Sequence, residues 1–284
     1  MPTGKDKKGG AEENADTKSA AEDEEKVKKR PVEIDEDFLE YIGDIYKDIV
    51  RPFPVSVGKA ISKKERQELN LKETTLVYGE LEFRPLALCF EKIKKKYGRP
   101  FIGASGPMGI LQEAGGKFYD LGSGLGKGCV AAALLHNFEV CYGIEILEGL
   151  YSMSLDVVAS YNSKGKAALD GRDFDTDIIM LNGDMLDPEF KDWSDADVVF
   201  ANSTCYSDTF LEQICDMALA LKKGAFVITF TKQLPSTDFE VLEYELHDMS
   251  WGAATVYIMQ KITNPHLPDH HKEQSEHHDS DEDA

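Results

Sequence analysis

The stretch from Lys117 to Glu145 constrains the fold more than any other part of the chain, and it reads KFYDLGSGLGKGCVAAALLHNFEVCYGIE. A short apolar segment leads through three alternating glycines into small and apolar residues, and a second apolar segment ends on an acid. This order predicts a buried strand, a tight turn, a helix and a second strand, which together form a βαβ-type unit. Because ligands bind at the carboxyl edge of such sheets, a nucleotide-type site is expected there.

The glycines need a physical reason, because glycine loses more conformational freedom on folding than other residues. Gly122, Gly124 and Gly126 lack Cβ atoms, so backbone N–H groups at a helix start can approach a ligand closely. Their spacing is G-x-G-x-G, whereas NAD sites carry a pyrophosphate on G-x-G-x-x-G. Asp120, just before the turn, would repel a dinucleotide and suits a cationic amino-acid group. The pattern therefore favours a cationic ligand without phosphates.

Two further strand ends supply groups for the same ligand. Glu145 follows the second strand, where its two oxygens suit two ribose hydroxyls. Asp184 follows a third predicted strand, residues 177–181, and is placed to accept the adenine amino group, with Met185 against the ring. A ligand with an ammonium, a ribose and an adenine but no phosphate is S-adenosylmethionine, which we expect as the cofactor.

The charge of the chain favours basic partners. Its 284 residues contain 32 Lys and Arg against 52 Asp and Glu, a net charge of −20. Such a field repels nucleic acid and membrane surfaces and attracts a basic protein, although acidity is also common in proteins that are merely soluble. No apolar run approaches the ~18 residues of a membrane span, and the N-terminus lacks the apolar region of a signal peptide. We therefore expect neither strong direct nucleic-acid binding nor a membrane association.

The cysteines indicate a reducing compartment. They are odd in number and show no C-x-x-C spacing, which predicts reduced core thiols in a nuclear or cytosolic protein. The five are Cys89, Cys129, Cys141, Cys205 and Cys215. A basic run at residues 26–30 is either a nuclear address or a solvated charge run. The histidines near the C-terminus imply no fixed metal geometry, and no metal site is predicted.

The chain divides into four regions by composition and periodicity. A disordered tail, a helical extension, a catalytic domain and a disordered acidic, His-rich tail are expected at residues 1–32, 33–75, 76–264 and 265–284. Within the extension, residues 34–50 predict an amphipathic helix, and residues 52–75 read as irregular with a short polar helix around 63–69. Residues 99–116 are glycine-rich and predict a surface loop.

Strands and helices alternate through the catalytic domain, which predicts an α/β fold with a mostly parallel sheet and helices on both faces. Helices are expected at residues 85–97, 130–135, 147–161 and 211–221. Strands are expected at residues 118–121, 140–144, 177–181, 197–201 and 225–231, and a closing antiparallel pair at 239–246 and 254–262, with Trp251 and Gly252 at its turn. This is the Rossmann-like arrangement of class I methyltransferases.

Several motifs in this order resemble the Dot-one (disruptor of telomeric silencing) family of histone lysine methyltransferases. They are Val77-Tyr-Gly-Glu80 before a helix, the Asp120 to Gly126 segment, Tyr142-Gly-Ile-Glu145, Gly183-Asp184 and the strand end at Asn202. The resemblance covers roughly residues 76–262. It implies a chromatin enzyme of the nucleus that uses S-adenosylmethionine to methylate a lysine of histone H-three in the nucleosome.

By position, the resemblance implies that Tyr78, Asp120, Gly122, Glu145 and Asp184 contact the cofactor and that Asn202 lies beside the lysine channel. The expected cofactor contacts are Tyr78, Glu80, Asp120, Gly122, Gly124, Gly126, Lys127, Glu145, Asp184, Met185 and Asn202. Asn202 and Tyr206 are expected to be catalytic, in a lysine channel with Trp251. Pattern alone leaves open whether Tyr78 and Glu80 form a lid or a plain helix entry.

The chain departs from the family where substrates are selected. Ser203 and Thr204 stand where the family has Asn and Phe, Lys127 stands where it often has an amide, and the basic flanks that hold relatives on nucleosomal DNA are absent. Two alternatives therefore remain: a class I methyltransferase acting on a non-histone protein or small molecule, and a catalytically silent scaffold. The intact Asp120, Gly122, Glu145 and Asp184 argue against the scaffold.

Overall fold

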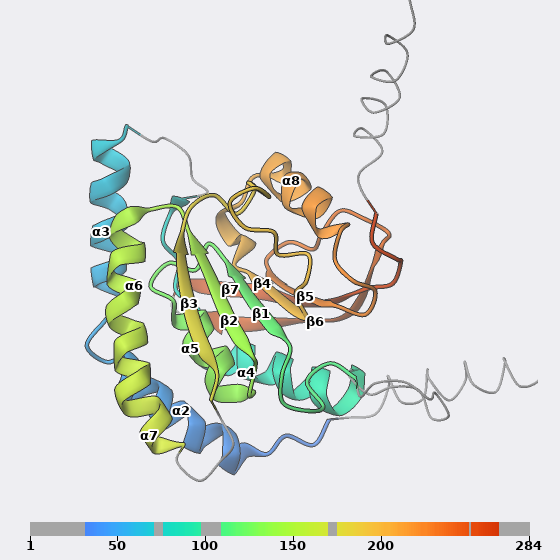
Figure 1. The fold of residues 1–284 in the computed structure, drawn as a ribbon, viewed down its shortest axis with the longest axis horizontal. Helices are drawn as coiled ribbons and strands as arrows, with labels where there is room; N and C mark the ends of the chain where they lie inside the picture. The colour runs from blue at the N-terminus through green and yellow to red at the C-terminus, as the bar shows by residue number, and fades with distance from the viewer. Residues whose placement is uncertain (1–31, 71–75, 98–108, 170–174, 250, 267–284) are drawn as a thin grey trace, which may run out of the picture.

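The computed structural model describes residues 32–70, 76–97, 109–169, 175–249 and 251–266 (Figure 1). Several sequence predictions lie wholly or mostly outside these residues. They are the two disordered tails, the basic run at 26–30, the greater part of the glycine-rich loop at 99–116 and the histidines beyond His266.

A seven-stranded sheet in the order β3-β2-β1-β4-β5-β7-β6 forms the centre of the molecule. The strands are β1 (Lys117–Leu121), β2 (Val140–Glu145), β3 (Asp177–Asn182), β4 (Val198–Ala201), β5 (Phe226–Phe230), β6 (Phe239–Met249) and β7 (Gly252–Lys261). The first five are mutually parallel, whereas β7 pairs antiparallel with both β5 and β6. The expected α/β, class I methyltransferase arrangement with a closing hairpin is confirmed.

Helices cover both faces of this sheet (Figure 1). The helices are α2 (Glu36–Val50), α3 (Val55–Glu68), α4 (Phe83–Lys92), α5 (Lys127–Leu135), α6 (Glu148–Ser160), α7 (Lys166–Ala168) and α8 (Asp208–Ala218), with short turns η2 (Ile93–Tyr97), η3 (Tyr161–Gly165) and η4 (Ser203–Cys205). Helices α2, α4, α5 and α6 share one apolar core with the sheet, and α8 packs in a second core on the opposite face. Because both faces are buried, the parallel strands read as continuous apolar runs.

Two sequence signals explain where the amphipathic helices begin. The Asp35 carboxylate accepts a hydrogen bond from Phe38 N at 3.0 Å, and the Ser207 hydroxyl accepts one from Phe210 N at 3.1 Å. Each side chain satisfies a backbone donor that lacks a partner in the first helical turn. Helices α2 and α8 therefore start at these caps, and α8 begins three residues before its predicted start.

The prediction for residues 52–75 is wrong in its main part, because α3 runs from Val55 to Glu68 rather than over a short polar stretch. Its fully buried positions are Gly58 and Ser62, and the apolar Val55 and Ile61 are only partly buried against the core, so the apolar periodicity that reveals a helix is weak. The predicted helix at 85–97 is α4 followed by the π-helical turn η2, and the closing strands extend to Met249 and start at Gly252.

Helix α3 is attached to the start of α6 by one carboxylate. Glu65 accepts hydrogen bonds from Glu148 N at 2.8 Å and Gly149 N at 2.9 Å. The N-cap of α6 is Leu147, whose apolar side chain cannot accept hydrogen bonds from these donors. A negative charge at a helix N-terminus is also favoured by the helix dipole. Glu65 therefore holds the N-terminal extension against the strand end that carries Glu145.

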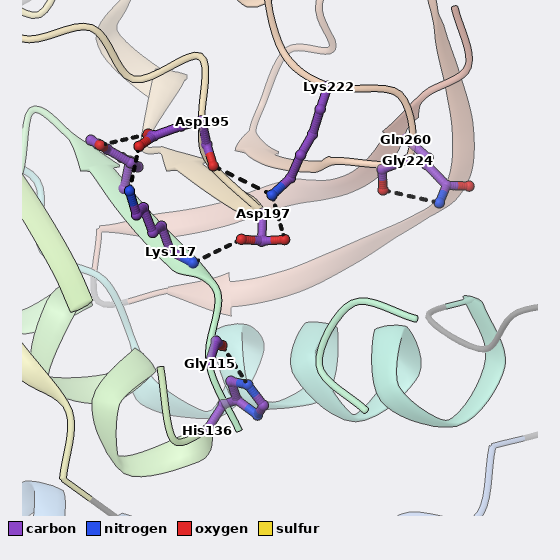
Figure 2. A network of polar contacts seen from close by, with 9 residues as sticks. Gly115, Lys117, His136, Asp195, Asp197, Lys222, Gly224 and Gln260 are labelled. Carbon is purple, nitrogen blue, oxygen red and sulfur yellow. Dashed lines mark hydrogen bonds and ion pairs between the residues drawn. The ribbon is translucent and has the colours of Figure 1, made fainter. Parts of the chain in front are cut away.

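A polar network ties the opposite, amino end of the sheet together (Figure 2). The Lys117 ammonium lies 2.6 Å from Asp195, and Lys117 N donates to Asp197 at 2.8 Å. Lys222 pairs with the same Asp197 at 2.7 Å. These contacts join the start of β1 to the loop that leads into β4 and to the turn before β5. The carboxyl ends of the strands, where a ligand would bind, take no part in this network.

Replacing Glu65 with Ala is expected to lower the free energy of unfolding by about 1–2 kcal/mol, because two backbone donors lose their carboxylate. Urea denaturation of the purified chain measures this change. Glu68→Ala is the matched control, since Glu68 is on the same helix, is 62% exposed and lies 3.8 Å from Lys64. Equal losses in the two variants would contradict the anchoring role of Glu65.

Candidate functional site

A cavity of about 250 Å³ lies at the carboxyl ends of the strands. Its walls come from the N-terminal extension, the glycine turn, the ends of β2 and β3, the segment after β4 and the turn of the β6–β7 hairpin. The lining residues are Lys59, Leu76, Val77, Tyr78, Gly79, Gly122, Gly124, Glu145, Ile146, Leu147, Leu150, Met185, Asn202, Thr204, Cys205, Tyr206, Phe210 and Trp251. The structure therefore brings together predicted residues from positions 78 to 251.

The glycine turn passes between two tyrosines. Gly122 and Gly124 have φ values of +76° and +55°, a region that residues with a side chain rarely adopt. A Cβ atom on Gly122 would lie 2.8 Å from the Tyr206 hydroxyl, and one on Gly124 would lie 2.6 Å from the Tyr78 ring. Glycine is thus required here by both backbone conformation and space. Gly126 is the N-cap of α5, with φ +73°, and does not line the cavity.

Tyr78 is held in place by a buried ion pair behind it. Its hydroxyl donates to Glu80 at 2.7 Å, and the same carboxylate oxygen lies 2.5 Å from the Lys127 ammonium. Lys127 is 5% exposed and also donates to the carbonyl of Phe53 at 2.6 Å. Tyr78 contacts the cavity, whereas Glu80 and Lys127 lie outside its lining. They join the N-terminal extension to the first turn of α5.

Glu145 lines the cavity with both carboxylate oxygens engaged. Gly124 N donates to one oxygen and Leu147 N to the other, each at 2.8 Å. Burial raises the pKa of Glu145 to about 7, although the two backbone donors oppose this shift. The carboxyl group of Glu145 therefore links the glycine turn to the start of α6 and places an acid at the cavity wall that a cation would ionise.

Asp120 and Asp184 both lie outside the cavity lining. Asp120 is 3% exposed and packs against Gly128 of α5. Burial and the charge of Glu145 raise the pKa of Asp120 to about 8. Asp184 is exposed and accepts a hydrogen bond from Leu186 N at 2.9 Å. Of the predicted adenine contacts, only Met185 reaches the cavity, and its carbonyl accepts the Trp193 indole N–H.

The predicted lysine-channel residues all line the cavity. Asn202 donates through Nδ2 to the Gly79 carbonyl at 3.3 Å and accepts through Oδ1 from Thr204 at 2.9 Å. Its amide orientation follows from these two bonds. The Tyr206 hydroxyl donates to the Leu121 carbonyl at 3.0 Å. Trp251 lines the cavity from the hairpin turn.

Other residues of the wall were not predicted as site residues. Lys59 lies on α3. Because most of this helix was not predicted, no pattern indicated that Lys59 faces the site. Leu150 and Phe210 lie in the first turns of α6 and α8, near strand ends that were predicted correctly. The first-turn residues of the helices after β2 and β4 could have been predicted as site residues, because these helices start at the carboxyl edge of the sheet, where ligands bind.

The strand order and the site at the carboxyl ends define a class I methyltransferase fold. The family described as "Histone methylation protein DOT1" matches residues 107–257. The chain belongs to this family. S-adenosylmethionine is the cofactor of this family. No curated protein sequence matches the chain.

Solved structures resemble the chain at low identity. TrmN from Thermus thermophilus is 17% identical with a TM-score of 0.42, over 54% of this chain and 46% of TrmN. A mutant of MtNAS in complex with S-adenosylmethionine is 15% identical with a TM-score of 0.43, over 75% of this chain and 77% of that chain. A putative RNA methyltransferase from Pyrococcus horikoshii is 14% identical with a TM-score of 0.39, over 64% of this chain and 98% of that chain. The chain thus spans about half the length of TrmN.

The described residues fit such a cofactor. Gly122 and Gly124 line the cavity with backbone alone, and a mostly apolar lining with the carboxyl group of Glu145 matches a ligand that combines an adenine, a ribose and a cation. Among the same residues, no cluster of His, Cys, Asp and Glu could hold a metal ion. No helix within the described ranges is long and apolar enough to span a membrane.

The buried carboxyls predict an unusual dependence of stability on pH. Because the folded state binds the protons of Asp120 and Glu145 more tightly than the unfolded chain, their stabilising contribution is complete below about pH 4. It is lost as the pH rises through the folded pKa values, which are about 7 for Glu145 and about 8 for Asp120. Without cofactor, the free energy of unfolding should therefore fall by the order of a few kcal/mol between pH 4 and 8.

Urea denaturation at several pH values measures this decline, and Asp120→Asn should flatten it. Asp184→Asn is the control, because Asp184 is exposed at the same edge of the sheet. If Asp120→Asn leaves the fall of unfolding free energy with pH unchanged, the raised pKa of Asp120 is not its cause.

The Lys127–Glu80 pair predicts strong coupling between two substitutions. Lys127→Met should lower the free energy of unfolding by about 3 kcal/mol, because it leaves a partly buried carboxylate without its cation. Adding Glu80→Gln should recover part of that loss, since the unpaired charge is then removed. A double-mutant cycle in urea measures the coupling. Additive losses would show that the two side chains do not interact.

Proposed function

We propose that the chain is a protein-lysine N-methyltransferase that acts on a basic protein, with histone H-three of the nucleosome as the first candidate. The observation that carries this proposal is that Asn202, Tyr206 and Trp251 line the same cavity as the predicted cofactor contacts. The family match supports it, because the family is one of histone methylation proteins. The acidic chain favours a basic substrate over nucleic acid.

The cofactor contacts are proposed in two groups. Tyr78, Gly122, Gly124, Glu145 and Met185 would touch S-adenosylmethionine, since they line the cavity. Glu80 and Lys127 would act through Tyr78, and Asp120 would act through its charge beside Glu145. Gly126 would shape the start of α5, and Asp184 would meet the adenine at the exposed rim.

When bound, S-adenosylmethionine supplies a methyl group on a positively charged sulfur. The protein must present a neutral amine, because a lysine with a pKa of ~10.4 is mostly protonated near neutrality. Trp251 and the ring of Tyr206 give the wall an apolar surface, which disfavours the ammonium form. The Asn202 Oδ1 atom, held by Thr204, can accept an N–H of the neutral amine and orient its lone pair.

The departures at positions 203 and 204 have structural roles that keep a second function open. The Ser203 hydroxyl donates to the Phe230 carbonyl at 2.5 Å, which fixes the segment after β4 to the end of β5. Thr204 binds Asn202 and lies 3.1 Å from the Thr231 hydroxyl. A polar Thr204 at the wall, where the family has Phe, also suits a non-histone protein or a small-molecule acceptor. A silent scaffold is the third proposal and requires no cofactor contacts.

The proposed setting is the nucleus, in keeping with chromatin. Direct contacts to nucleic acid are expected to be weak, because DNA affinity depends largely on basic residues that neutralise phosphates. No oligomeric state is proposed.

Transfer of labelled methyl from S-adenosylmethionine tests the function. Recombinant nucleosomes, free core histones and a lysate without histones serve as parallel substrates. Labelling of histone H-three in nucleosomes supports the leading proposal, and labelling confined to the lysate supports the second. Cofactor binding without any labelling would favour the scaffold.

Asn202→Ala should lower turnover by roughly tenfold or more while the affinity for S-adenosylmethionine stays nearly unchanged, because the amide orients the acceptor rather than the cofactor. Single-turnover kinetics and calorimetry measure the two quantities. Asn162→Ala provides an exposed amide control on η3. If affinity and turnover fall together, the proposed role of Asn202 is wrong.

A further inference from the structure

Thr231 follows the last residue of β5, Phe230, and adopts a backbone conformation that threonine rarely takes. Its φ is +68°, and a positive φ is a marked outlier for a β-branched residue. Lys232 N donates to the Phe230 carbonyl at 2.8 Å, so the chain makes a three-residue turn centred on Thr231. Such a turn with a positive φ at its centre is rare and strained. Residues strained in this way cluster at functional sites.

Burial does not explain why threonine stands at this position. The side chain of Thr231 is exposed, so it adds little to the apolar core. Glycine would adopt the same φ without a steric cost. What the threonine adds is a hydroxyl, which lies 3.1 Å from the Thr204 hydroxyl in the segment after β4. Thr204 lines the candidate site, whereas Thr231 lies behind it, outside the lining.

The direction of the hydrogen bonds follows from how many protons each group carries. The Asn202 Nδ2 group donates to the Gly79 carbonyl at 3.3 Å, which leaves Oδ1 facing Thr204. The Thr204 hydroxyl therefore donates to Oδ1, at 2.9 Å. A hydroxyl has a single proton to donate, so Thr204 accepts from Thr231 rather than donating to it. The three side chains form a continuous series of hydrogen bonds that ends on the Asn202 oxygen.

The segment that carries Thr231 is anchored on two sides. Thr231 N donates to the Thr255 carbonyl of β7 at 2.6 Å. The Lys232 ammonium donates to the Tyr206 carbonyl at 2.8 Å. The end of β5 is thus fixed both to β7 and to the segment after β4, which holds the Thr231 hydroxyl beside Thr204. A strained conformation persists where the surrounding structure enforces it in this way.

We propose that Thr231 is a positioning residue of the methyltransferase and acts on Asn202 through the Thr204 hydroxyl. This inference rests on the proposed function, in which Asn202 Oδ1 accepts an N–H of the amine. Because Thr231 donates to the Thr204 oxygen, the Thr204 proton stays directed at Oδ1. Hydrogen bonds in such a series also polarise one another. An amide oxygen has two acceptor lone pairs, so one remains for the amine.

Thr231→Val tests the role, because valine keeps the β-branched shape and removes only the hydroxyl. Methyl transfer to recombinant nucleosomes should show a kcat lower by about three- to tenfold, with KM and cofactor affinity unchanged. Thr231→Ser keeps the hydroxyl and should recover most of the rate. Thr209→Val is the matched control, since Thr209 is exposed on α8 and outside the cavity lining, and it should leave kcat unchanged.

Two further variants separate positioning from a general loss of stability. In an Asn202→Ala background, Thr231→Val should change kcat by less than about twofold, because residues that act as one unit give non-additive effects. Thr231→Gly relieves the strained φ, so its unfolding midpoint should equal or exceed that of the parent chain while kcat still falls. Equal fold-losses of kcat in the parent and Asn202→Ala backgrounds overturn the proposal. So does full activity of Thr231→Gly.

A readout that needs no substrate distinguishes this inference from the proposed function. The side-chain amide signals of Asn202 in a ¹H–¹⁵N correlation spectrum are identified by their loss in Asn202→Ala. Thr231→Val should shift these signals, whereas Thr231→Ser and Thr209→Val should leave them nearly in place. Unshifted signals in Thr231→Val overturn the positioning role even if methyl transfer is observed. Shifted signals, with no labelling of any protein by the parent chain, retain the link from Thr231 to Asn202 and overturn the function.

Discussion

The contact between the Tyr78 ring and the glycine turn is the interaction on which the site depends. Gly124 can lie against the ring only because it lacks a Cβ atom, which would come within 2.6 Å. The hydroxyl of the same tyrosine reaches Glu80, whose charge is balanced by Lys127 in the first turn of α5. The segment before α4 and the βαβ unit are therefore joined through one aromatic ring and one ion pair. The cavity lies beside this junction, so its shape requires both parts of the chain.

Electrostatics shape the site as much as packing does. Two carboxyls, Asp120 and Glu145, are buried near each other, and burial raises both pKa values. A cationic ligand nearby would stabilise their charged forms, which a phosphate would not. Two buried acids that a nearby cation would ionise are consistent with a cationic cofactor.

Much of the fold follows from the sequence because its signals are local. The glycine spacing, the apolar runs of parallel strands and the closing pair predict the observed α/β arrangement with its antiparallel hairpin. Helix α3 was missed, because Gly58 and Ser62 on its buried face leave only a weak apolar periodicity. Lys127 was noted as a departure, but its partner Glu80 lies 47 positions away and no local pattern reveals such a pair. Asp120 and Asp184 were identified by position in the chain, which does not determine which way a side chain points.

The most direct test of the central claim is a crystal structure of the full chain with S-adenosylhomocysteine. The account predicts ligand density in the cavity between Tyr78 and the glycine turn, with the ribose hydroxyls at Glu145 and the adenine at Met185. A ligand bound elsewhere, or one that leaves Tyr78 and Glu145 without contact, would contradict the account.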